Sequence, residues 1–225
     1  MSARTTPRCY FSFRSPYSWL AHQELSIRHR ALAERMEWVP FFDPDPLTAR
    51  LVAERGGHLP PGPARDDDRV WEVPHLAHLA AAEHGRGRDF LDAAFRARFL
   101  TGRDLCDRAT VEAIGRGLGL PAGLLGRASD LPRLRARAIG GLLDALADGV
   151  FGVPFFAHGT TRCFGLDRVD AFAARVPAPA PARAPDPAPA RAPAAGPARA
   201  PAAARGQPSD PHQPAVSAAS RRSSP

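Results

Sequence analysis

Residues 9–21 read CYFSFRSPYSWLA. The start of this stretch is apolar and suits a short buried strand over 8–13, and its end begins a helical pattern that runs over 16–34. Pro16 suits the first helical position, because the N–H group that proline lacks would have no partner there. Ser15 therefore stands at a helix N-terminus, where the backbone dipole favours negative charge. A hydroxyl at this point can donate a hydrogen bond to the thiolate of a bound ligand.

Two serines, Ser15 and Ser18, decide which chemistry this junction can support. In a thioredoxin-type fold the same strand-to-helix junction carries a Cys-x-x-Cys pair. Two hydroxyls cannot form a disulfide, so the sequence argues against a disulfide oxidoreductase and favours a site for a thiol cofactor. The alternative is that Ser15 is only an ordinary helix cap. We expect Ser18 to be a residue of the first helical turn.

The remaining pattern predicts an α/β protein with a helical middle. A second strand over 38–42 completes a β-α-β unit. Helices are expected at 47–55, 75–84, 88–101, 108–118 and 131–148, with a loop at 58–69. Asp107 is a good N-cap, and Gly149 ends the last long helix. The chain then returns to a strand-like run over 150–156, a hairpin over 157–164 that turns near Gly159, and a terminal helix over 167–176.

The last part of the chain, residues 177–225, differs sharply in composition. It repeats Pro, Ala and Arg and contains no Phe, Trp, Tyr, Leu or Ile. Such a segment cannot bury enough apolar surface to offset the entropy of ordering, so we expect a disordered tail. Its six arginines and two aspartates supply +4 of the formal charge of +7, which leaves +3 for the rest. We therefore expect no specific nucleic-acid partner.

The cysteines, the histidines and the lack of long apolar runs argue against several classes of protein. The three cysteines form no close pair, which argues against a disulfide framework and a metal site: Cys9, Cys106 and Cys163. His75 and His78 lie one helical turn apart, but no ligand set is completed around them. Residues 1–7 lack the apolar segment of a secretory signal, and no apolar run approaches the ~20 residues that span a bilayer. We expect a cytoplasmic protein with no membrane association.

Three ordered motifs resemble those of the 2-hydroxychromene-2-carboxylate isomerases and kappa-class glutathione transferases: YFSFRSPYSWLA (10–21), DGVFGVPFF (148–156) and CFGLDRVD (163–170). A fourth, GRDLCD (102–107), is similar to a segment of that family's helical domain. The resemblance covers about residues 8–176. It implies a thioredoxin-like fold, as in the DsbA family, with an inserted all-helical domain. The boundaries are 8–45 and 149–176 for the thioredoxin-like domain, and 46–148 for the insertion.

The resemblance also implies a site for glutathione or another low-molecular-weight thiol. Ser15 matches the residue whose hydroxyl contacts the glutathione sulfur. Val153 precedes an expected cis Pro154 and pairs with the tripeptide through its backbone. Asp167 matches an acidic residue near the γ-glutamyl amine, although capping of the last helix is an alternative role for it. Arg14 is either the local cation for a thiolate or substrate carboxylate, or an exposed surface arginine.

Two positions depart from the family pattern. Leu166 stands where a Ser or Asn is usual, and Phe155 replaces the Thr that follows the cis-proline. The resemblance implies a glutathione-dependent isomerase that acts on a small aromatic or polyketide-like substrate, and it leaves a homodimer open. The alternatives are a kappa-type glutathione transferase, whose product keeps the thiol, and a non-catalytic binding protein with a degenerate site.

Overall fold

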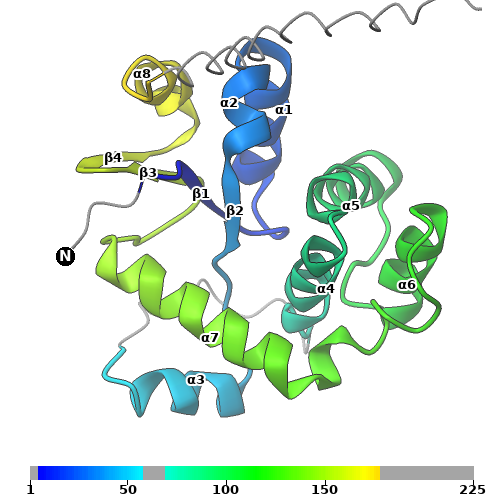
Figure 1. The fold of residues 1–225 in the computed structure, drawn as a ribbon. Coiled ribbons are helices and arrows are strands. Elements are labelled where there is room, and N and C mark those ends of the chain that lie inside the picture. The colour runs from blue at the N-terminus through cyan, green and yellow to red at the C-terminus, as the bar shows by residue number, and fades with distance from the viewer. Residues whose placement is uncertain (1–4, 58–68, 178–225) are drawn as a thin grey trace, which may run out of the picture. The chain divides into compact units, whose positions relative to one another are not determined.

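The computed structural model describes residues 5–57 and 69–177. Most of the loop expected at 58–69, and the tail except Pro177, lie outside the described residues. Four strands form one sheet in the order β2-β1-β3-β4. They are β1 (Arg8–Phe11), β2 (Glu37–Pro40), β3 (Phe155–His158) and β4 (Thr161–Phe164). β1 and β2 are parallel and the other pairs are antiparallel, which confirms the α/β class and the thioredoxin-like topology (Figure 1).

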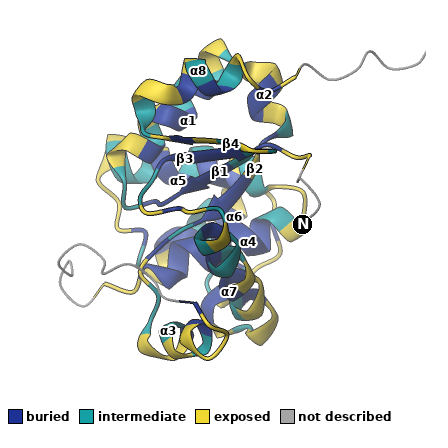
Figure 2. Ribbon diagram, turned by 90° about the vertical axis from the view of Figure 1, so that its left-hand side faces the viewer, coloured by how far each residue is buried: buried dark blue, intermediate teal, exposed yellow. Residues whose placement is uncertain are grey.

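Helices cover both faces of this sheet (Figures 1 and 2). α1 (Pro16–Arg28), α2 (Arg30–Arg35) and α8 (Val169–Ala173) lie on one face, where the rings of Phe156 and Phe172 stack at 5.3 Å. α7 (Pro132–Ala147) lies on the other face, where its Ala145 joins a cluster with Tyr10 and Phe155. In the described residues the segment between β2 and β3 is helical. Besides α7 it contains α3 (Pro46–Ala53), α4 (Glu72–Glu83), α5 (Gly87–Thr101), α6 (Arg108–Gly117) and a 3-10 turn (Ala128–Asp130).

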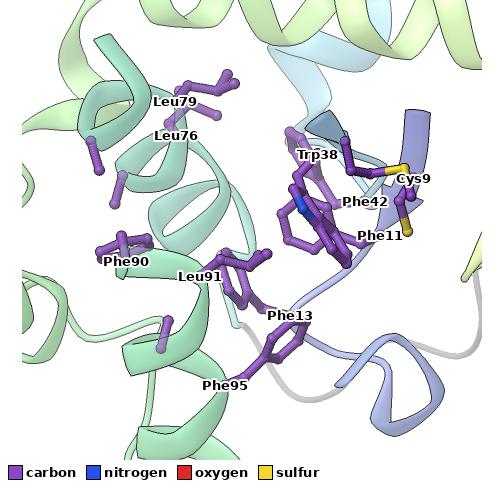
Figure 3. Packing of buried hydrophobic residues seen from close by; sticks show 14 of the residues in the cluster. Cys9, Phe11, Phe13, Trp38, Phe42, Leu76, Leu79, Phe90, Leu91 and Phe95 are labelled. Carbon is purple, nitrogen blue, oxygen red and sulfur yellow. The ribbon is translucent and has the colours of Figure 1, made fainter. Parts of the chain in front are cut away.

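The sheet and the inserted helices share one hydrophobic cluster. Phe11 and Phe13 come from β1 and the turn after it, and both are fully buried. They meet α4 and α5 side chains such as Leu76 and Phe95, and the rings of Phe13 and Phe95 lie 5.1 Å apart (Figure 3). Full burial of one such side chain contributes about 1.5–3 kcal/mol. The inserted helices are therefore held against the turn that follows β1, which is where the site residues begin.

Local signals in the sequence set most element ends. Ser15 caps α1 with Pro16 behind it, and Asp107 caps α6 by accepting from the amides of Ala109 (3.0 Å) and Thr110 (3.2 Å). Gly149 ends α7 with a φ of +76°, and Gly159 turns the hairpin with a φ of +53°. These four predictions are confirmed.

Tertiary contacts changed several other boundaries. The helix expected over 16–34 is interrupted at His29, whose Nε2 lies 2.7 Å from Asp170 Oδ1 on α8. The strand expected from 150 begins only at Phe155, directly after Pro154, which has no N–H to offer a neighbouring strand. The terminal helix expected from 167 begins as a 3-10 turn, η2 (Leu166–Arg168), and continues as α8.

Candidate functional site

Three segments of the chain meet at one end of the sheet. Phe155 opens β3 and faces Tyr10 near the end of β1 on one side and Phe164 at the end of β4 on the other. The residues that follow β1, precede β3 and follow β4 must therefore gather there. Gly165 N–H donates to Pro154 O (2.9 Å), which joins the last two segments. All four residues that the sequence proposed for the site, Ser15, Val153, Pro154 and Asp167, belong to these segments.

Ser15 is the N-cap of α1, and its hydroxyl proton is not used by the capping hydrogen bond. Its Oγ accepts from Ser18 N–H at 3.1 Å, and its backbone is extended, with φ −85° and ψ 117°. Because the oxygen accepts in this bond, the hydroxyl proton remains to be donated. Ser18 is fully buried, and its own Oγ accepts from Ser12 N–H at 3.2 Å. The capping role is thus confirmed, and it does not compete with donation to a ligand.

The turn that presents Ser15 has every backbone amide bound. Residues 12–15 supply four N–H groups, and side chains accept from three of them. The acceptors are Ser18 Oγ for Ser12 (3.2 Å), His75 Nε2 for Phe13 (3.0 Å), Ser12 Oγ for Arg14 (3.2 Å) and Ser12 O for Ser15 (3.1 Å). None of these amides is available to a ligand. These four hydrogen bonds hold the turn in the conformation that presents Ser15.

One amide in the first turn of α1 is open. Pro16 has no N–H, Ser18 N–H is held by Ser15 Oγ, and Trp19 N–H donates to Ser15 O at 3.3 Å. Tyr17 N–H is left without an acceptor among the described residues. The Ser15 hydroxyl and this amide stand together at the N-terminus of a 13-residue helix. They suit an anion such as a thiolate.

Arg14 is not the exposed surface arginine that was one expectation. Its side chain is 19% exposed, and Nη1 lies 3.2 Å from Asp43 Oδ2. The sequence interval of 29 residues between the two gave no sign of this pair. The carboxylate neutralises the guanidinium that stands next to Ser15. The support for negative charge at Ser15 therefore comes mainly from the helix end.

Asp167 lies at a cavity of about 430 Å³ between α1 and the start of α8. It does not cap a helix, because neither η2 nor α8 has a side-chain cap bond. Its Oδ2 lies 3.2 Å from Arg168 Nε. A Cβ at Gly165, where φ is +100°, would come within 2.7 Å of Asp167 Oδ1, so the glycine makes room for that carboxylate. Leu166 also lines the cavity, whereas Ser15, Val153 and Pro154 do not.

Carboxylates outnumber cations in this cavity. Its apolar lining comes both from α1 and from the segment that begins α8. Its charged lining consists of Glu24, Arg28, Asp167 and Asp170. Arg28 pairs with Glu24 and, at 3.0 Å, with Asp170. A hydrogen bond from His29 lowers the pKa of Asp170, which keeps that carboxylate ionised. With Arg28 in the lining and Arg168 against Asp167, one of the three carboxylates is left over, and this excess of negative charge suits a ligand that ends in an ammonium group.

The peptide bond between Val153 and Pro154 is cis, as the resemblance implied. Val153 is half-buried and Pro154 is buried. Two exposed aromatic rings pack together near this peptide: Phe151, two residues before Val153, is 64% exposed, and Phe164, at the end of β4, is 44% exposed, with their centroids 4.6 Å apart. Phe155, which replaces the usual Thr, is buried beneath Phe151 at 6.0 Å. The change at this position therefore adds to the core rather than to the site.

None of the three cysteines forms a disulfide. Burial raises the pKa of the Cys9 thiol in β1, which keeps it protonated and inert. No group of three or more His, Cys, Asp or Glu residues in the described parts of the chain is arranged to hold a metal. Across residues 5–57 and 69–177, none of the helices combines the length and apolar character that crossing a membrane requires.

Sequence reasoning missed His75 and the Tyr17 amide. His75 was considered only as a metal ligand, but it bonds the backbone of the Ser15 turn. A signal was present in the sequence, because the run VPHLAHLAAA (73–82) is apolar except for His75 and His78, one helical turn apart. The open amide of Tyr17 follows from the capping rules once Ser15 and Pro16 are placed.

Solved structures share this fold at low sequence identity. 2-Hydroxychromene-2-carboxylate isomerase is 18% identical, with a TM-score of 0.55 over 73% of this chain and 91% of that protein. The oxidoreductase DsbA from Xylella fastidiosa is 14% identical, with a TM-score of 0.54 over 77% and 90%. The cytosolic disulfide reductase DsbM from Pseudomonas aeruginosa, determined with GSH, is 20% identical, with a TM-score of 0.51 over 75% and 95%. No family model and no curated protein matches the sequence.

Proposed function

We propose that this protein binds glutathione, or a related low-molecular-weight thiol, at Ser15 and catalyses a thiol-dependent isomerisation. The observation that carries the proposal is the spare hydroxyl proton of Ser15 at the N-terminus of α1. It stands at the same end of the sheet as the cis peptide before β3. Two structures with this fold support the choice of ligand and reaction, the 2-hydroxychromene-2-carboxylate isomerase and the DsbM determined with GSH.

The residues present fit such a thiol. Ser15 donates its hydroxyl hydrogen bond to the sulfur, and Tyr17 N–H supplies a second donor from the first turn. The backbone of Val153 pairs with the peptide part of the ligand. Asp167, with the other carboxylates of the cavity, receives the ammonium group of the γ-glutamyl end. Leu166 contributes only apolar contact at the position where the family pattern has a polar residue.

A bound thiolate supplies a nucleophile that adds to a conjugated substrate and leaves again, so that isomerisation consumes no thiol. Ser15 and the helix end stabilise negative charge, and this electrostatic support is the main contribution asked of the protein. The turn at 12–15 is already fixed by its own hydrogen bonds, so little reorganisation accompanies binding. The substrate is a small molecule of aromatic or polyketide type, and the working compartment is the cytoplasm.

Ser15→Ala tests the proposal, because the two roles of Ser15 have different costs. Loss of a hydrogen bond to a charged sulfur costs about 1.5–3 kcal/mol, roughly tenfold or more in affinity. Loss of the cap costs about 1 kcal/mol of folding stability. Glutathione binding by calorimetry and thermal unfolding should be measured on the same sample. Ser26→Ala, a substitution within α1 away from its cap, is the control and should change neither.

A Ser15→Ala protein that unfolds at a lower temperature but binds glutathione as before would show that Ser15 is only a cap. Analysis of the product separates the reaction types. An isomer free of thiol supports the proposed reaction, whereas a product that retains the thiol would place the protein among the transferases.

A further inference from the structure

His75 joins the inserted helices to the turn that presents Ser15. It is fully buried in α4, 62 residues from its partner Phe13. Its Nε2 lies 3.0 Å from Phe13 N, and its Nδ1 lies 2.6 Å from Trp71 O. A carbonyl can only accept and an amide N–H can only donate, so Nδ1 carries the proton and Nε2 accepts. The two partners thus select one neutral tautomer.

Packing holds the imidazole in this orientation. The ring stacks on Phe42 at 4.6 Å with an interplanar angle of 11°, and the Phe13 ring lies 5.2 Å away. Burial lowers the pKa of His75 to about 3, so the neutral form persists at any working pH. A protonated ring would turn a second N–H toward the Phe13 amide, which is itself a donor.

We propose that His75 is a positioning residue for the thiol site. The inference rests on the proposed role of Ser15. Phe13 N–H has one acceptor, His75 Nε2, and Phe13 stands two residues before Ser15. Without that acceptor a buried N–H is left unsatisfied, and the turn has to move to find another. A shift of about 1 Å at a binding group costs up to roughly a hundredfold in rate. By fixing the turn, His75 keeps Ser15 Oγ in its orientation.

The chain offers a matched control in His78. It lies one turn later in α4, is 3% exposed, and also bonds the backbone of the sheet domain. Its Nε2 lies 3.3 Å from Trp38 O, so its hydrogen bond goes to β2 and not to the Ser15 turn, although its ring also lies 6.3 Å from the ring of Phe13. Both histidines are buried on the same helix, but His75 accepts a hydrogen bond from the Phe13 amide, whereas His78 bonds the carbonyl of Trp38. Loss of either lowers stability, but only loss of His75 should alter the thiol site.

The test uses the full chain and glutathione as the probe. The variants are His75→Leu, His78→Leu and His75→Gln, whose amide oxygen can accept from Phe13 while its NH₂ group donates to Trp71 O. Ultraviolet absorbance of the thiolate over pH gives the pKa of the bound thiol, and calorimetry gives the affinity. Hydrogen exchange reports the Phe13 amide directly. If His75→Leu does not fold, His75→Phe removes the acceptor and keeps a ring against Phe42.

We expect His75→Leu to raise the pKa of the bound thiol, to weaken glutathione binding roughly tenfold or more and to speed exchange at Phe13. His78→Leu should lower the melting temperature without these three effects, and His75→Gln should restore most of the binding. Equal effects of the two leucine variants on the bound thiol would refute the role of His75. Absence of glutathione binding by the unaltered protein would refute the proposed function itself.

Discussion

Replacement of Arg135 by methionine should reveal how strongly the inserted helices depend on one buried ion cluster. Arg135 on α7 approaches Asp45 Oδ2 (2.9 Å) at the start of α3 and Glu72 Oε2 (3.2 Å) at the start of α4. It also donates to Thr48 Oγ1 at 2.7 Å. The Glu72 side chain is 2% exposed and that of Arg135 21%. One guanidinium therefore joins three helices and balances two carboxylates.

Removal of one partner from a buried ion pair costs about 3–5 kcal/mol, because the remaining charge is left without compensation. We expect a value near the lower limit, about 3 kcal/mol at neutral pH, because the Asp45 side chain is 29% exposed and water can reach it. Methionine fills a volume similar to the arginine stem, so the loss reports the charge more than the packing.

The loss should depend on pH with a defined sign. Burial raises the pKa of Glu72 above its ordinary value, and Arg135 opposes that rise. Without Arg135 the folded-state pKa of Glu72 moves further above its unfolded value, so the folded variant binds a proton more tightly than the unfolded one. Its stability therefore falls as pH rises from about 4.5 toward the raised pKa. For Asp45, burial raises the pKa, but Thr48 N–H and Arg135 together hold the pKa below its ordinary value. This lowered pKa stabilises the folded state above about pH 4, and removal of Arg135 reduces that stabilisation.

Urea unfolding at about pH 5 and about pH 8 provides the measurement, with the midpoint and slope compared between variants. Arg133→Met is the control, because Arg133 is 55% exposed and pairs with Glu83 at 3.2 Å on the surface. It should cost less than about 1 kcal/mol at either pH. A loss below about 1 kcal/mol for Arg135→Met, or an equal loss at both pH values, would contradict the buried-cluster argument.

Two further predictions concern the site. Gly165→Ala should lower the melting temperature and weaken glutathione binding, because the added Cβ meets Asp167 Oδ1 at 2.7 Å. Gly159→Ala is the control: this glycine also has a positive φ but lies in open space, so its replacement should lower the melting temperature alone. Equal glutathione binding by both variants would count against a role for Asp167. The purified protein should not accelerate the reduction of insulin by dithiothreitol, because Ser15 and Ser18 cannot form a disulfide. Acceleration that survives both Cys106→Ser and Cys163→Ser would overturn that exclusion.

Local chemistry in the sequence was sufficient for several element ends and for the serine at the N-terminus of α1. The Ser15-Pro16 pair caps α1, Asp107 caps α6, and Gly149 ends α7, because each of these signals acts within one helical turn. The alternation of strand and helix patterns predicted the α/β class. The likeness of three short motifs to a known family implied the cis peptide before Pro154, which periodicity alone does not reveal.

Contacts between distant segments decided the rest. The break at His29 depends on Asp170, and the pairing of Arg14 depends on Asp43. The bond from Phe13 to His75 spans 62 residues, and no local pattern encodes such a pairing. These contacts exist only when the sheet register and the helix packing place both partners together, because side-chain hydrogen bonds and ion pairs act over about 3 Å. The sequence by itself determined that a serine stands at the N-terminus of α1, and the tertiary structure decided what holds that residue in place.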